Sequence, residues 1–267
     1  MRAKLTLAIV LIATVLVAMT WPIDTAECGG VVEDELISYW SFDDIEGDTV
    51  NDAWGKNHGT FVGDPEIVAK GKTGNALDAA TGYVEFDDAN MPAGNDPRTI
   101  CAWVKLAEKV FLNDDNAVIS WGAAGDAELS GMLVREGGTA YFVGAMADME
   151  SNGTMKVGVW NHITITYDGK LLRIYINGKL DKEDPPGLQW DPKKARKLNT
   201  VLNTGTIGIL SVGGEAPFDV GLIDEVSVYG KALSADEVKR NYTQPGGLAV
   251  NSAGKTALTW GAIKASN

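Results

Sequence analysis

The chain has few of the residues that most often carry chemistry. Its 267 residues include two cysteines and two histidines. Two cysteines are too few for the disulfide framework of a small secreted scaffold and allow a single bridge at most. Neither His58 nor His162 has a second metal-binding residue at a useful spacing, so a histidine zinc site is not indicated. A Gly-x-Ser-x-Gly turn, which would present a nucleophilic serine, is also lacking.

Positive charge is scarce as well. The chain has 23 Lys and Arg residues against 36 Asp and Glu residues, a formal net charge of -13 at pH 7. A surface of that sign repels phosphate backbones and anionic lipid, so we expect no nucleic-acid partner. The same charge favours solubility and the binding of a cation such as calcium.

Long apolar runs are limited to one, at residues 5–18, which follows a basic start containing Arg2 and Lys4. This is the pattern of a secretory signal peptide, which we assign to residues 1–26. The run is shorter than the roughly 20 residues of a membrane span. We therefore predict a secreted or cell-surface protein with no membrane insertion beyond the signal segment; an uncleaved anchor is the alternative.

Short β-rich segments separated by turn residues make up most of the remaining chain, which contains 31 glycines overall. Alternation is clearest between residues 160 and 182, where Asp168-Gly169 and Asn177-Gly178 interrupt it as two-residue hairpin turns do. Three consecutive antiparallel strands are predicted there. Further strands are predicted at residues 36–42, 82–87, 99–106, 117–121, 131–135, 140–146 and 222–229.

One short helix is predicted near the end of the chain. Ser234 and Glu237 have the spacing of a capping box, and the helix should run to about Tyr242. Residues 33–243 then form one domain, and residues 244–267 form a C-terminal tail. We interpret residues 184–200 as an exposed excursion from the domain.

Seven motifs occur in the order of a known domain family. Together they resemble the laminin-G-like jelly roll of the concanavalin A-like lectin and glucanase superfamily, in an exported protein of bacterial type. The resemblance implies an all-β fold: a two-sheet antiparallel jelly-roll sandwich with one short C-terminal helix. The motifs are Tyr39-Trp40-Ser41-Phe42-Asp43, Asn57-His58-Gly59-Thr60, Gly71-Lys72-Thr73-Gly74-Asn75-Ala76-Leu77, Tyr83-Val84-Glu85-Phe86, Thr99-Ile100-Cys101-Ala102-Trp103-Val104-Lys105, the run from Trp160 to Gly178, and the run from Gly221 to Ser234.

A structural calcium ion is the first site that the resemblance implies. In several related jelly rolls, a carboxylate near the first strand and one at the start of the last strand meet at one ion. Here these would be Asp43 and Asp224, with Asn57 or a backbone carbonyl around Gly59 completing the oxygen shell. The alternative is that Asp43 caps a turn and Asp224 forms a surface pair.

A carbohydrate-binding site is the second site that the resemblance implies, since aromatic rings in jelly rolls stack on the apolar faces of sugars. The rings that we select are Trp54, Trp121, Tyr141 and Trp190. For the first three, a position in the core is the alternative, and a core position is what we predict for Trp40, Trp103 and Trp160.

The two cysteines leave two possibilities open. Cys28 and Cys101 can form a disulfide in an exported protein. Equally, Cys101 can remain a buried free thiol, because it lies within an apolar strand.

Catalysis is not indicated. Glucanases on this fold place three carboxylates on one strand face in a Glu-x-Asp-x-Glu pattern, and this chain has no such triplet. We predict a non-catalytic exported binding module that recognises a glycan or an extracellular protein. The alternatives are a structural or adhesive surface protein without a small ligand and, third, a glycoside-hydrolase-like enzyme.

Overall fold

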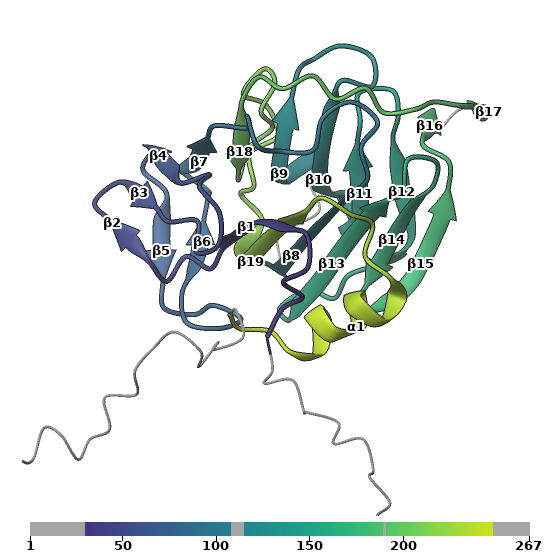
Figure 1. Cartoon of the computed structure of the whole chain (residues 1–267). Coiled ribbons are helices and arrows are strands. Elements are labelled where there is room, and N and C mark those ends of the chain that lie inside the picture. Colours follow the sequence, from purple (N-terminus) through teal and green to yellow (C-terminus); the bar gives the residue numbers. More distant parts are fainter. Residues whose placement is uncertain (1–29, 108–114, 189–190, 248–267) are drawn as a thin grey trace, which may run out of the picture.

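The computed structural model describes residues 30–107, 115–188 and 191–247. Within these residues two antiparallel sheets stack face to face, with one short α-helix near the end of the chain (Figure 1). The predicted two-sheet antiparallel jelly-roll sandwich is confirmed. No helix among the described residues has both the length and the apolar character needed to cross a bilayer.

Sheet A has eight strands. From one edge, its order is β15 (Lys179–Asp184), β14 (Leu172–Ile176), β13 (Trp160–Tyr167), β8 (Arg98–Leu106), β19 (Gly221–Tyr229), β6 (Ala76–Asp78) and β5 (Glu66–Val68). The eighth strand, β1 (Leu36–Trp40), pairs with the second half of β19. The first and last strands of the described residues are therefore neighbours.

Sheet B has nine strands. In order they are β12 (Met149–Thr154), β11 (Thr139–Val143), β10 (Leu129–Arg135), β9 (Asp115–Gly122), β18 (Gly205–Ile207), β7 (Gly82–Phe86), β4 (Gly59–Gly63), β3 (Thr49–Val50) and β2 (Ile45–Glu46). A single 3-10 turn, Glu136–Gly138, joins β10 to β11. The shortest strands are absent from the sequence-based prediction because two or three residues are too few to show alternation.

The main core lies between the sheets and follows the alternation of the strands. On β8, Ile100, Ala102 and Val104 face this core, and on β13 Ile163 and Ile165 do so. Their chain neighbours therefore point to the outer side of sheet A, since successive side chains of a strand alternate between faces. The outer side of sheet A therefore carries side chains that can pack against the helix.

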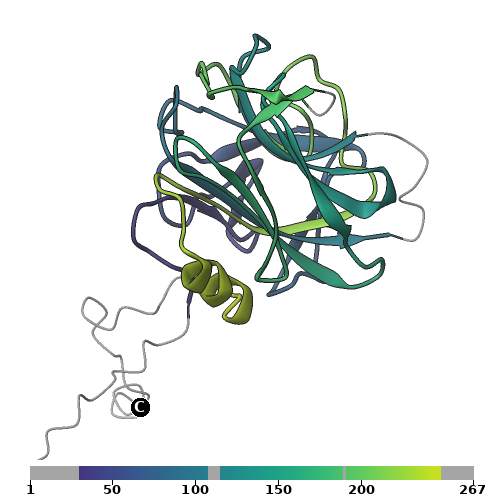
Figure 2. The ribbon, with the colours of Figure 1, turned by 90° about the vertical axis from the view of Figure 1, so that its right-hand side faces the viewer.

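A smaller apolar cluster covers part of the outer side of sheet A. It joins Cys101, Tyr175 and Tyr229 from the sheet to Val238 of α1 (Ala235–Thr243). The helix lies outside the sandwich, as Figure 2 shows. It begins as predicted: Ser234 and Glu237 form a complete capping box.

Of the two predicted two-residue hairpin turns, only Asn177-Gly178 is one, because the connection from β13 to β14 spans the four residues 168–171 and Asp168 does not have a positive φ angle. Asn177 and Gly178 both have positive φ angles, of 52° and 74°, which is the conformation of a type I′ turn. Gly169 has a φ of 89°. The three strands β13, β14 and β15 consequently pair in sequence, as predicted.

The folded unit extends beyond residues 33–243 at both ends. Val31 and Val32 are buried, and the backbone N–H of Val32 donates to the side chain of Asn241. The N–H of Val31 donates to the carbonyl of Gly247. The two ends of the described chain are thus joined beside α1.

The segment 184–200 is less separate from the sandwich than expected. Asp184 still belongs to β15, and a two-stranded ribbon follows, β16 (Gly187–Leu188) with β17 (Asp191–Ala195). Gly187 bridges to Asp148, and Thr200 pairs with Gly94 through the backbone. Both ends of the excursion are therefore fixed to the domain.

Candidate functional site

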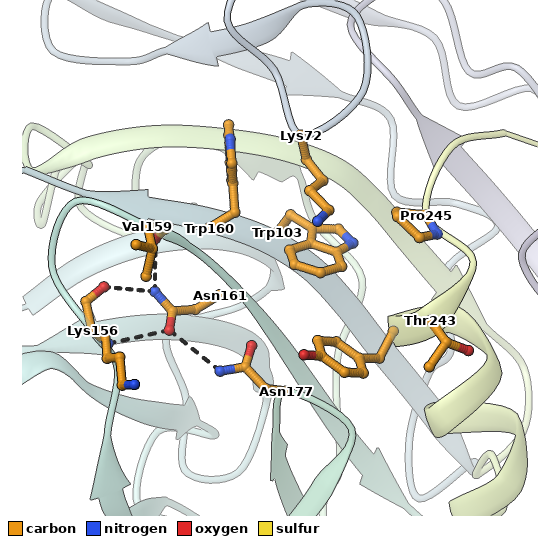
Figure 3. A pocket seen from close by; sticks show the side chains of 10 residues that line it. Lys72, Trp103, Lys156, Val159, Trp160, Asn161, Asn177, Thr243 and Pro245 are labelled. Carbon is orange, nitrogen blue, oxygen red and sulfur yellow. Dashed lines mark hydrogen bonds between the residues drawn. The ribbon is translucent and has the colours of Figure 1, made fainter.

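An open groove on the outer side of sheet A is the candidate site. Its cavity volume is about 580 Å³. We call it the outer groove, and Figure 3 shows its lining. The lining comes from β8 and β13, the segment before β13, the turn after β14, the loop before β6, and the end of α1 with the residues after it. The lining residues are Lys72, Trp103, Lys156, Val159, Trp160, Asn161, Asn177, Tyr242, Thr243 and Pro245.

Strand alternation places two tryptophans here. Trp103 lies between the core-facing Ala102 and Val104, so its own side chain points outward. Trp160 is the first residue of β13 and is in the outward phase of that strand. Trp103 is 3% exposed, whereas Trp160 is half-buried. The prediction that Trp160 belongs to the core is therefore wrong, and the alternation of Ile163 and Ile165 could have revealed it.

The helix supplies a third ring. Tyr242, in the last turn of α1, is stacked on Trp103 with 5.7 Å between ring centroids and 22° between their planes. Gly178 makes room for it, because a Cβ atom there would lie 2.9 Å from the tyrosine ring. The half-buried Tyr242 and Trp160 are the aromatic surfaces that the outer groove offers to solvent.

Lys72 reaches the same tryptophan from the loop before β6. Its Nζ lies 4.0 Å from the centroid of the Trp103 ring, a cation–π contact. The loop is held by two carboxylates. The N–H groups of Lys72 and Thr73 donate to Asp224, at 2.6 and 3.1 Å, and the N–H of Asn75 donates to Asp43 at 2.7 Å.

The amide groups of the outer groove have structural partners. Asn161 donates to the carbonyls of Lys156 and Val159, at 2.8 and 2.9 Å, and accepts from the N–H of Lys156 at 3.2 Å. Asn177 accepts from the N–H of His162 at 2.9 Å. These bonds shape the wall of the groove, and they leave the two lysine ammonium groups as its charged surface.

Two buried titratable groups lie beside the outer groove. Burial, with repulsion from Lys72, lowers the pKa of His162 to about 3. This imidazole is therefore neutral at pH 7. Burial, reinforced by the adjacent Glu225, raises the pKa of Asp224 to about 8, although three backbone N–H groups bond to its carboxylate. Glu225 accepts a hydrogen bond from the hydroxyl of Tyr39.

Of the four rings selected from the sequence, the three that the structure describes do not line the outer groove. Trp54 is 42% exposed, and its indole N–H donates to the carbonyl of Leu36. Tyr141 is 9% exposed, with the guanidinium of Arg135 4.7 Å from its ring centroid. Trp190 lies outside the described residues.

Trp121 must be withdrawn as a ligand-binding ring. Its side chain is fully buried, and its N–H donates to the carbonyl of Pro92. An irregularity in the pairing of β9 with β10 shifts the alternation, so that Val118 and Ile119 both join the core and Trp121 follows Ile119 inward.

The three residues selected for calcium are only partly brought together. Asp43 and Asp224 hold the same loop, but their oxygens accept backbone N–H groups there. Asn57 has other partners, since it donates to Ser38 and accepts from Asn90. In the part of the chain that the structure describes, no group of three or more His, Cys, Asp or Glu residues is arranged to hold a metal ion. This arrangement does not fit the proposed ligand set of Asp43, Asp224 and Asn57.

The disulfide also stays a prediction, because Cys28 lies outside the described residues. Cys101 is buried and has no disulfide partner among the residues described. Its sulfur receives weak hydrogen bonds from Thr164 and Asn241, and burial raises the pKa of the thiol to about 11.

Comparison with known proteins supports the fold. A family model described as "Concanavalin A-like lectin/glucanases superfamily" matches residues 78–239. Among curated protein sequences, none matches the chain.

Several solved structures are similar to the chain. Domain 4 of AbnA, a GH43 extracellular arabinanase from Geobacillus stearothermophilus in complex with arabinotriose, is 20% identical with a TM-score of 0.58, over 78% of this chain and 98% of that one. The ligand binding domain of botulinum neurotoxin serotype D in complex with N-acetylneuraminic acid is 14% identical with a TM-score of 0.58, over 79% and 51%. A Trypanosoma rangeli sialidase is 16% identical with a TM-score of 0.59, over 85% and 35%. The chain thus spans about half the length of the neurotoxin chain and about a third of the sialidase chain.

Proposed function

Because the chain belongs to the concanavalin A-like lectin and glucanase superfamily, we propose that it is a non-catalytic module that binds a glycan in the outer groove. The observation that carries this proposal is the lining of the groove. It combines two half-buried rings, Trp160 and Tyr242, with lysine ammonium groups. Sugars offer an apolar ring face and polar substituents around it, and this lining matches both.

A binding role is favoured over hydrolysis by what faces the groove. Retaining glycosidases need two carboxyl groups about 5–5.5 Å apart, and inverting ones need a pair somewhat further apart. The described residues that line the outer groove include no Asp or Glu. Asp224 is close by, but its carboxylate is buried and bonded to the backbone of Lys72 and Thr73.

Two of the similar structures support a sugar as the ligand class. One was determined with arabinotriose and the other with N-acetylneuraminic acid. At 20% and 14% identity these similarities establish the fold alone, so the ligand of this chain rests on the groove itself. We propose in addition that the protein acts outside the cell, as the predicted signal peptide at residues 1–26 suggests.

The test is a glycan array probed with the purified chain and with Trp160→Ala. Covering a tryptophan face with ligand is worth about 1.5–3 kcal/mol when burial is complete. We therefore expect the substitution to weaken retention by roughly ten- to hundredfold.

Trp54→Ala is the matched control, because Trp54 is also exposed and lies outside the outer groove. It should retain the glycans that the wild type binds. Equal losses in both variants, or a loss only in Trp54→Ala, would contradict the assignment of the groove.

A further inference from the structure

The charged side chains that line the outer groove are all positive. The whole chain carries a net charge of -13, yet the charged residues that line the groove are Lys72 and Lys156. Lys105 adds a third positive charge beside it, because it is the cross-strand neighbour of Trp160. The groove is therefore a positively charged surface on a protein whose net charge is negative, and it can attract an anionic ligand.

The two lysines that line the groove have no counter-ion within the described chain. The ion pairs found there use Arg135, Arg173, Arg196 and Lys231. Lys72 and Lys156 take part in none of them. Their charges remain available to a ligand.

Lys72 is also held in place before any ligand arrives. Its backbone N–H is bound to Asp224, and the same loop is bound to Asp43 through Asn75. Its ammonium group rests 4.0 Å from the Trp103 ring centroid. Figure 3 shows the side chain of Lys72 over Trp103, with Lys156 at the other end of the groove beside Val159 and Asn161. An ordered ammonium group loses less conformational entropy when it binds an anion than a freely moving one does.

From these observations we infer that the outer groove takes a glycan bearing a carboxylate, such as a uronic or sialic acid residue, and that Lys72 binds the carboxylate. The inference rests on the proposed function and specifies its ligand. The apolar face of the sugar lies against Trp160 and Tyr242, and the carboxylate accepts hydrogen bonds from the ammonium of Lys72. Lys156 contributes to the attraction from the other end of the groove.

The test compares acidic probes with neutral partners of the same skeleton, using isothermal titration calorimetry on the full chain. One pair is trigalacturonate and its methyl ester, and the other is sialyllactose and lactose. In at least one pair we expect the acidic probe to bind about tenfold tighter or more, since hydrogen bonds to charged groups are the stronger kind. Raising the salt from about 0.1 M to about 1 M should reduce this preference, because the Debye length shortens from about 10 Å to about 3 Å.

Two variants, Lys72→Met and Lys56→Met, distinguish an effect of the groove lysine from an effect of the protein's net charge, because each removes one positive charge. Lys72→Met keeps an apolar stem over Trp103 and removes the ammonium, and Lys56 is an exposed lysine outside the groove. We expect the acidic preference to fall to near unity in Lys72→Met and to persist in Lys56→Met.

The outcomes distinguish the inference from the proposed function. If the array shows glycan binding but acidic and neutral partners bind equally, or if both methionine variants behave alike, the inference is overturned and the proposed function stands. Binding to sulfated glycans without binding to either carboxylated probe would also overturn it. If no glycan binds in any format, the proposed function fails and the inference fails with it.

Discussion

At the scale of single residues, burial determines the charge of the histidine that lies beside the outer groove. His162 is 2% exposed and contacts the ring of Trp103, with 5.0 Å between centroids. Burial lowers its pKa to about 3, so it is neutral where an exposed histidine would begin to titrate. Lys72 lies over the same tryptophan, with its Nζ atom 4.0 Å from the ring centroid.

The buried His162 should make the protein sensitive to acid. Between pH 6.5 and about 3 the unfolded chain binds a proton at this residue and the folded chain does not. Stability is therefore lost as the pH falls, by up to about 1.4 kcal/mol for each pH unit. His162→Phe keeps a ring beside Trp103 and removes the titration. Urea unfolding at several pH values across this window should show a smaller acid-induced loss in the variant.

The comparison with wild type is what isolates His162. Buried carboxyl groups such as Asp224, whose pKa is raised, act in the opposite direction, since they favour the folded state when protonated. They are present in both proteins and cancel in the difference. Parallel stability profiles for wild type and His162→Phe would show that His162 is protonated in the folded state.

At the scale of elements, α1 connects the local sequence to the groove. Its capping box and its buried residues Val238 and Asn241 hold it on sheet A. Its last turn then places Tyr242 on Trp103. Strands β8 and β13 provide the floor, because they are neighbours and their outward phases coincide at Trp103 and His162.

Loss of the N-terminal cap of α1 should lower the stability of the domain. Ser234→Ala removes the oxygen that accepts the N–H of Glu237. The expected cost is about 1 kcal/mol, which corresponds to a fall of roughly 2–4 °C in the melting temperature of a domain of this size. Differential scanning calorimetry measures it.

Ser234→Thr is the control, because threonine retains the capping hydroxyl. It should melt close to the wild type. If Ser234→Thr lost as much stability as Ser234→Ala, a steric role of the serine would replace the cap as the explanation.

At the scale of the whole molecule, two acidic residues join distant parts of the chain. Asp43 follows the first strand, Asp224 is in the last strand of sheet A, and both bind the backbone of the loop that contains Lys72. These hydrogen bonds link the regions of the first and last strands through the loop, the role that was predicted for a structural calcium ion. The cohesion comes from backbone hydrogen bonds that both side chains accept from this loop.

Removal of divalent ions tests this interpretation. Because Asp43 Oδ1 and both side-chain oxygens of Asp224 already accept backbone N–H groups, we expect thermal melting to be unchanged by a chelator. Asp224→Asn, melted with and without the chelator, is the reference. A chelator that lowers the melting temperature of the wild type but not of the variant would demonstrate a bound cation that Asp224 helps to hold.

The sequence by itself determined the type and position of the longer elements, because the signals involved are local. Alternation marks the longer strands, Asn177-Gly178 requires positive φ angles, and Ser234 with Glu237 starts the helix. Each of these depends on residues only a few positions apart. The fold class and the position of the helix could therefore be read without coordinates.

Only the tertiary structure decided the site. Trp121 is buried because the pairing of β9 is irregular, and Trp160 is available because of its phase on β13. The outer groove joins Lys72, Trp103 and Tyr242, which are far apart in the chain. Their meeting depends on which strands are neighbours and on where the helix docks. Those are long-range packing choices that no local pattern encodes.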